Sequence, residues 1–137
     1  MYRRRTNEYV TQDKYKGREV TDAGFLAALV GFFPDDDDGY RAKIAREYLK
    51  RVLVLLDEIR RVETRLFSSS LLLIYEGDYM LEEQQPQQQQ QHAALCDVRM
   101  IDFAHSYYPP TVEGIDEGYI KGLLNLVGFL QRILDIQ

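Results

Sequence analysis

The chain has only one cysteine, Cys96, so no disulfide bond can form within it. It also has no uninterrupted apolar run of the ~18 residues that a membrane-spanning helix needs. The arginines at positions 3–5 are not followed by the apolar core of a signal peptide. Nothing therefore indicates an oxidising compartment, and we expect an intracellular protein of the cytoplasm, the nucleus or both, without a transmembrane segment.

Excess positive charge is also missing. Lys and Arg total 17 against 22 Asp and Glu, which gives a net charge of -5. General nucleic-acid binding depends on neutralising many phosphates with basic side chains, so we expect no nucleic-acid partner. Residues 3–5 form the one basic run, which is more simply explained as a solvated terminal segment than as an anion site.

The length of 137 residues, with 45% hydrophobic content, predicts one compact domain. Residues 8–13 suit a short strand that Gly17 would end. A helix is predicted from an N-cap at Thr21 to Phe33, because apolar residues recur at helical spacing until Pro34.

The later elements have clearer periodicity. Over residues 40–67 the apolar positions advance by threes and fours, which predicts a long amphipathic helix whose apolar face is core rather than a partner-binding stripe. Residues 71–75 are a continuous apolar run, as expected of a strand covered on both faces. A last helix is predicted to begin at an Asp116 N-cap. The predicted fold class is α+β, a small and mostly antiparallel sheet packed with about three helices.

Two stretches have low complexity. The acidic residues 35–38 do not fit a calcium-binding EF-hand, because the first and twelfth ligand positions would fall on Pro34 and Ala45; we interpret them as a solvated turn. The glutamine-rich residues 84–91, within a linker over 82–95, cannot bury apolar area to offset the entropy of ordering. This tract is predicted to be a linker, with association with protein partners as the alternative.

Residues 97–108 indicate a site. Val98, Met100 and Phe103 lead up to and past Asp102, which places this carboxylate where a strand would leave its sheet. Phosphoryl transfer from ATP needs such a carboxylate to hold Mg²⁺ against the nucleotide phosphates. The alternative is a partly buried strand with one polar end.

Three segments resemble motifs of the inositol polyphosphate kinase family, in the order in which that family has them. They are residues 68–77 (Ser-Ser-Ser-Leu-Leu-Leu-Ile-Tyr-Glu-Gly), 98–105 (Val-Arg-Met-Ile-Asp-Phe-Ala-His) and 116–123 (Asp-Glu-Gly-Tyr-Ile-Lys-Gly-Leu). Residues 15–18 (Tyr-Lys-Gly-Arg), ahead of a helix that ends in Phe32-Phe33, are similar to the family segment upstream of these. The resemblance covers nearly the whole chain outside the two low-complexity stretches.

The resemblance implies the carboxy-terminal lobe of an inositol polyphosphate kinase, which uses Mg²⁺ and ATP to phosphorylate hydroxyls of inositol phosphates. It implies that Asp102 is the catalytic metal ligand and that His105 and Arg18 contact the inositol phosphate. It matches Ser69 and Ser70 to family serines for which nucleotide or metal contact, capping and packing remain open.

The family's Pro-x-x-x-Asp-x-Lys-x-Gly motif, which supplies a catalytic Asp and Lys, does not occur in this sequence, and neither does the amino-terminal lobe. We therefore expect a fragment, a shortened gene model or a reduced relative, and little or no activity from the chain alone. The strings resemble the multikinase branch most and the inositol hexakisphosphate kinase branch second. The alternative from another class is a non-catalytic binding or interaction module.

Overall fold

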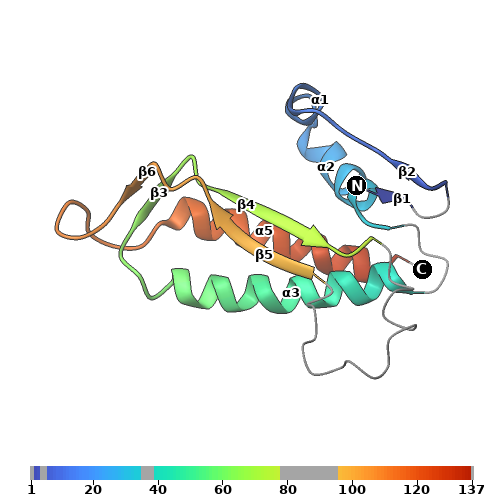
Figure 1. The fold of residues 1–137 in the computed structure, drawn as a ribbon. Coiled ribbons are helices and arrows are strands. Elements are labelled where there is room, and N and C mark those ends of the chain that lie inside the picture. The colour runs from blue at the N-terminus through green and yellow to red at the C-terminus, as the bar shows by residue number, and fades with distance from the viewer. Residues whose placement is uncertain (1, 4–5, 35–38, 78–95, 137) are drawn as a thin grey trace, which may run out of the picture. The chain divides into compact units, whose positions relative to one another are not determined.

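The computed structural model describes residues 2–3, 6–34, 39–77 and 96–136 (Figure 1). The chain divides into two units, which are described separately. Unit 1 consists of Met1–Ile44 and Tyr75–Leu95, and unit 2 of Ala45–Ile74 and Cys96–Gln137.

Unit 1 contains a two-stranded antiparallel ladder and two helices. Strand β1 (Tyr2–Arg3) pairs with β2 (Glu8–Tyr9), and helices α1 (Lys14–Arg18) and α2 (Asp22–Phe32) follow. The strand predicted over residues 8–13 is wrong beyond Tyr9, because Asp13 accepts hydrogen bonds from two following amides and begins α1. Gly17 lies inside that helix instead of ending a strand.

Helix α2 is confirmed together with its start. The Thr21 hydroxyl accepts a hydrogen bond from the amide of Gly24 at 3.2 Å, which is the N-cap that the sequence predicts. At the other end Phe32 packs edge-to-face on Tyr75, whose hydroxyl donates to the Phe32 carbonyl at 2.9 Å. These contacts join the end of α2 to the last residue of β4 (Ser70–Tyr75), 43 residues later.

Helix α3 (Tyr40–Ile59) ends earlier than the sequence predicts. The apolar spacing continues through Val62 and Leu66, but Val62 is exposed and the chain turns after Ile59. It then forms strand β3 (Arg65–Phe67), in which half-buried, buried and exposed side chains follow one another. Apolar residues spaced by three and four thus continue from the helix into a short strand. The prediction of one helix over 40–67 is wrong after Ile59.

Strand β4 (Ser70–Tyr75) pairs with β5 (Cys96–Ile101), and the two run in opposite directions (Figure 1). Both predicted strands are confirmed. The prediction that β4 is covered on both faces is wrong, since exposed and half-buried side chains alternate along it and Leu72 and Ile74 are exposed. This alternation is typical of a sheet with one face packed and one face open.

Strand β6 (His105–Tyr107) is an element that the sequence did not predict. It pairs antiparallel with β3, with Leu66 opposite Ser106. The last helix, α5 (Glu117–Leu134), begins at the predicted Asp116 cap.

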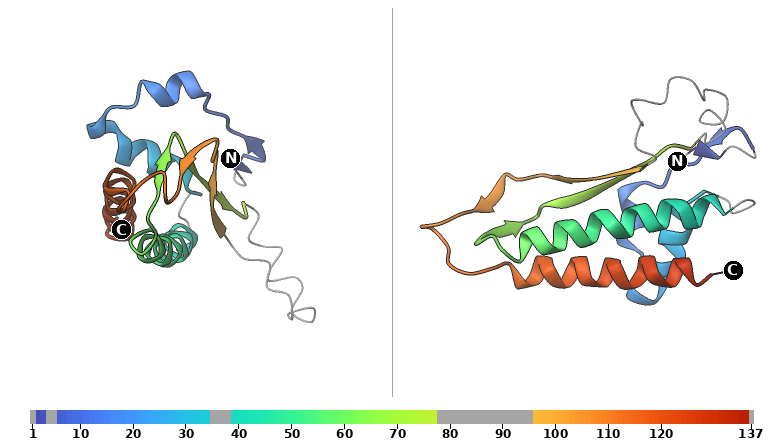
Figure 2. Two further views of the ribbon diagram at one scale, coloured as in Figure 1. Left: turned by 90° about the vertical axis from the view of Figure 1, so that its left-hand side faces the viewer. Right: turned by 90° about the horizontal axis from the view of Figure 1, so that it is seen from below.

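In unit 2 helices α3 and α5 lie side by side along one face of the strands (Figure 2). The apolar stripes of both helices meet there and supply most of the buried side chains. These core residues are Ala45, Tyr48, Val52, Leu56, Ile59, Leu66, Cys96, Leu123, Val127, Leu130 and Ile133. The interpretation of the helical stripes as core is confirmed.

Three interpretations concern residues outside the described ranges. The solvated turn at 35–38, the glutamine tract at 84–91 and the whole linker over 82–95 fall there. Within the described ranges, no helix combines the length and the apolar character that crossing a membrane requires.

Candidate functional site

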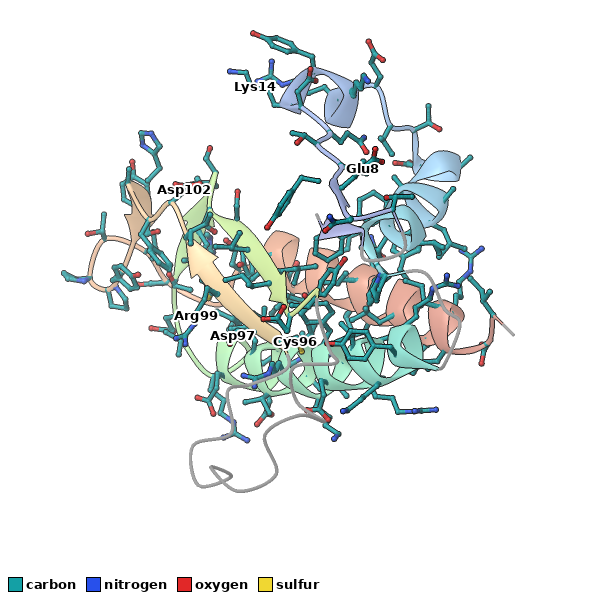
Figure 3. All side chains as sticks on the ribbon, turned by 45° about the vertical axis from the view of Figure 1, so that its right-hand side comes forward. Glu8, Lys14, Cys96, Asp97, Arg99 and Asp102 are labelled. Atoms are coloured by element: carbon teal, nitrogen blue, oxygen red, sulfur yellow. The ribbon has the colours of Figure 1, made fainter. Side chains whose placement is uncertain are left out.

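Asp102 lies immediately after the last residue of β5, as the sequence predicts, at the end of the strand opposite to Cys96 (Figure 3). Its backbone has a φ of 65°, in the left-handed region that few residues other than glycine adopt. Aspartate tolerates this conformation better than most residues, and such backbone values concentrate at functional sites. The left-handed residue ends the strand and turns the chain toward β6.

The Asp102 carboxylate is exposed and has no hydrogen bond or ion pair with any side chain or amide of the described ranges. Its oxygens are therefore available to a ligand. No group of three or more His, Cys, Asp and Glu side chains that could hold a metal exists among the residues described. A single carboxylate still fits Mg²⁺, since this ion is commonly bound through one or two carboxylates together with substrate phosphates and water.

Ser69 and Ser70 lie at the same end of unit 2, because β4 begins where the antiparallel β5 ends (Figure 1). Ser70 is the exposed first residue of β4. Ser69 is half-buried, and both its amide and its hydroxyl donate to the carbonyl of Leu66, the latter at 3.2 Å. Its hydroxyl oxygen can still accept a hydrogen bond, so a ligand contact by Ser69 stays a prediction.

Ser68, just before them, is the second left-handed residue of this region, with a φ of 59°. Sequence reasoning did not single it out. A serine with positive φ has no strong signature in a sequence, and only the tight turn between β3 and β4 discloses it.

His105 begins β6 and stands directly opposite Phe67 in the ladder. Its side chain is exposed, as are those of Phe67 and Tyr107, whose rings pack edge-to-face with centroids 6.0 Å apart. His105 and Asp102 are separated by two residues, Phe103 and Ala104, and a hydrogen bond from the Ser106 amide to the Phe103 carbonyl closes that turn. The turn keeps the imidazole and the carboxylate on one short, constrained stretch of backbone.

Arg18 belongs to unit 1, where it is the last residue of α1. The helix is exposed along its whole length, and Lys14 and Lys16 are further cations on it. The structure thus assembles Ser69, Ser70, Asp102 and His105 within unit 2, whereas Arg18 is part of the other unit.

Arg65 fixes the loop that precedes α5 to strand β3. Its guanidinium donates to the carbonyls of Glu113, Gly114 and Ile115 at 2.7–2.9 Å, and to that of its neighbour Thr64. All of these are backbone acceptors, so the five N–H donors of an arginine serve a structural purpose here. Sequence reasoning missed this residue, since an arginine in an amphipathic pattern looks like an ordinary surface residue.

The start of β5 is joined to α3 by an ion pair. The Asp97 carboxylate accepts from Arg51 of α3 at 3.1 Å, from Arg99 at 2.6 Å and from the amide of Val98. Partial desolvation acts to raise the pKa of Asp97, but the hydrogen bonds from Arg99 and Val98 and the nearby positive charges lower it below its ordinary value. Burial raises the pKa of the adjacent Cys96 thiol, against an opposing effect of the Arg51 charge.

Comparison with solved structures shows that the fold is similar to that of inositol phosphate multikinases. The inositol phosphate multikinase Ipk2 of S. cerevisiae, solved in complex with ADP and Mn²⁺, matches with a TM-score of 0.73 and 30% identity over 89% of this chain and 50% of that one. A second inositol phosphate multikinase structure matches with a TM-score of 0.70 at 18% identity, over 98% and 59% of the two chains, and shows the fold alone.

The chain belongs to the inositol polyphosphate kinase family, whose sequence model matches residues 1–131. Among curated relatives, inositol hexakisphosphate kinase 3 of Mus musculus is 37% identical over 97% of this chain and 36% of its own length. The Homo sapiens protein of the same name is 34% identical, over 91% and 35%, and inositol hexakisphosphate kinase 2 of Rattus norvegicus is 32% identical, over 97% and 38%. The chain thus spans little more than a third of these relatives. The predicted family and fold class are confirmed.

Proposed function

We propose that this chain is part of an inositol phosphate kinase that uses Mg²⁺ and ATP to phosphorylate a hydroxyl of an inositol phosphate. The observation that carries the proposal is the exposed carboxylate of Asp102, which has no partner among the described residues and follows β5 with a left-handed backbone. The related yeast multikinase was solved with ADP and Mn²⁺, which supports a site for a nucleotide and a divalent metal in this family.

The candidate residues of unit 2 have separate roles in this proposal. Asp102 holds Mg²⁺, which neutralises charge on the transferring phosphoryl group. His105, exposed three residues further on, donates a hydrogen bond to a substrate hydroxyl or phosphate. Ser69 and Ser70, at the start of β4, would contact the nucleotide. In unit 1, Arg18 pairs with a phosphate of the inositol ring through its planar guanidinium.

The branch of the family is a finer part of the proposal. Relatives by sequence are hexakisphosphate kinases, whereas the solved neighbours are multikinases. We keep an inositol phosphate as the substrate class, with the multikinase branch first and the hexakisphosphate kinase branch as the alternative. A purified enzyme that contains the chain, assayed against inositol trisphosphate and inositol hexakisphosphate in parallel, would separate them.

The metal assignment can be tested on the chain itself. Mn²⁺ added with ADP should bind to the wild-type chain, and Asp102→Asn should abolish or strongly weaken binding, as followed by the paramagnetic resonance of free Mn²⁺. Asp135→Asn, which removes one exposed carboxylate just after α5, is the matched control and should bind as the wild type does. Equal binding by the wild type and Asp102→Asn would refute the assignment.

A non-catalytic module is the second candidate, favoured by the missing Pro-x-x-x-Asp-x-Lys-x-Gly motif. We expect the purified chain, given Mg-ATP and inositol trisphosphate, to show no turnover above a buffer control, because positioning and electrostatic stabilisation supply nearly all the catalysis of phosphoryl transfer. Genomic sequence upstream of the Met1 codon distinguishes the candidates: an in-frame copy of the motif supports a larger kinase, and its absence supports the module.

A further inference from the structure

Strand β3 has one edge paired with β6 and one edge turned away from it. Such an outer edge presents backbone groups that need partners. The Leu66 amide is one of them, and it donates to a carboxylate oxygen of Asp116 at 2.8 Å, across 50 residues of sequence. The Leu66 carbonyl accepts from Ser69. Both groups of the central residue of β3 are thus taken by side chains.

Asp116 makes a second bond at the same time. Its other carboxylate oxygen accepts from the Tyr119 amide at 2.9 Å, as the N-cap of α5. One carboxylate therefore joins the first turn of α5 to the edge of β3. Only Asp among the common N-cap residues has two equivalent acceptor oxygens, since Ser and Thr have a single oxygen and Asn has one oxygen and a donor.

The bridged residue, Leu66, lies next to two members of the candidate site. It is opposite Ser106, the neighbour of His105 in β6, and its carbonyl holds Ser69. The side chain of Tyr119, on α5, lies near both Ser69 and Asp116. Its hydroxyl is buried, and burial raises its pKa, as does the charge of Asp116, while the nearby Ser69 hydroxyl has the opposite effect. Within the described ranges that hydroxyl has no hydrogen-bond partner.

We propose that Asp116 is a positioning residue for the candidate site: by accepting a hydrogen bond from the Leu66 amide at the cap of α5, it sets the position of Ser69, just after β3, and of His105 in β6. The inference rests on the proposed function for what these two residues would contact. We assign no substrate contact to Asp116 itself. Its effect on the site passes through Leu66 of β3.

The test uses the whole chain, without metal, nucleotide or substrate. His92 is changed to Gln so that His105 is the one histidine left, and its ring signals are followed by NMR. Asp116→Ser keeps an acceptor for the Tyr119 amide but has no second oxygen for Leu66, whereas Asp116→Ala loses both. Thr21→Ala, which removes the N-cap of α2 in unit 1, is the control for the loss of a helix cap.

In Asp116→Ser, exchange of the Leu66 amide should accelerate about tenfold or more, as expected for one lost bond to a charged group. The His105 and Ser69 signals should move as far in Asp116→Ser as in Asp116→Ala, and should keep their wild-type positions in Thr21→Ala. Should Asp116→Ala not fold, Asp116→Asn takes its place, because it keeps the cap and the side-chain volume with one acceptor oxygen.

Unmoved His105 and Ser69 signals in Asp116→Ser, beside faster Leu66 exchange, would overturn the proposal and leave Asp116 as a helix cap alone. Wild-type Leu66 exchange in that variant would also overturn it. Failure of the proposed kinase function would show separately, as a lack of Mn²⁺ binding at Asp102. It would not alter the expected responses of the His105 and Ser69 signals or of Leu66 exchange, which are recorded without metal.

Discussion

Strand β5 has an aspartate near each end, and the two differ in every contact. Asp97, at its start, accepts bonds from two arginines and from a backbone amide, and its pKa is lowered. Asp102, after its end, has a left-handed backbone and a carboxylate with no partner in the described ranges. A paired carboxylate stabilises the fold, whereas one left unpaired by its own chain is available to a ligand.

The largest effect that would sharpen this comparison is on catalysis. In an enzyme that contains this chain, Asp102→Asn should lower the rate of phosphate transfer by several orders of magnitude, since it weakens the metal site and removes no core volume. Asp97→Asn is the matched variant on the same strand and should change the rate little. Comparable rate losses in both, measured as kcat on inositol trisphosphate, would break the comparison.

The next effect concerns the strands beside Asp102. Arg65→Lys keeps the charge but cannot reach three consecutive carbonyls with one planar group, so it should lower the free energy of unfolding by about 1–3 kcal/mol. Denaturant melts measure this loss. Arg132→Lys, at an exposed position of α5, is the control and should be close to neutral. A neutral Arg65→Lys would mean that water replaces the guanidinium without cost.

A smaller effect is expected from pH at the Asp97 end. Because the folded-state pKa of Asp97 is lowered, its contribution to stability is present above the ordinary aspartate pKa and is lost as pH falls through the folded value. Asp97→Asn should therefore reduce stability at neutral pH and flatten the loss of stability below about pH 4, as chemical melts at several pH values would show. If stability falls with pH in Asp97→Asn as steeply as in the wild type, other carboxylates cause the acid sensitivity.

The smallest effect is expected from the glutamine tract that precedes β5. Deleting residues 84–91 should cost less than about 1 kcal/mol, because the entropy of closing a loop changes only logarithmically with its length. Strands β4 and β5 should keep their pairing, and the melts of intact and shortened chains can be compared directly. A midpoint lowered by the equivalent of several kcal/mol would mean that the tract packs on the domain.

What could be predicted from the sequence was mainly what local chemistry decides. Thr21 and Asp116 have side chains that satisfy the first amides of a helix, and both helices begin where the sequence indicates. The position of Asp102 after a strand was also predicted from local chemistry, since Val98 and Met100 are residues that suit a strand and lead up to it. The family resemblance rested on whole strings of residues, and those strings form β4, β5 and α5.

What could not be predicted depends on distant contacts. Strands β3 and β6 have three residues each, too few for a periodic signal, and they exist because they pair with each other across about forty residues. The bond from Leu66 to Asp116 spans 50 residues and has no signature at either position. Arg18 and His105, for which the resemblance implied contact with the same inositol phosphate, belong to separate units of the structure.

The burial of Cys96 gives the protein a reporter of its own. The thiol is 2% exposed at the first residue of β5, and it is the sole thiol of the chain. A raised pKa keeps it protonated and unreactive while the strand is in place. A thiol-specific reagent will therefore label the chain only when β5 opens, so the labelling rate measures how often this strand leaves its helices, without any engineered probe.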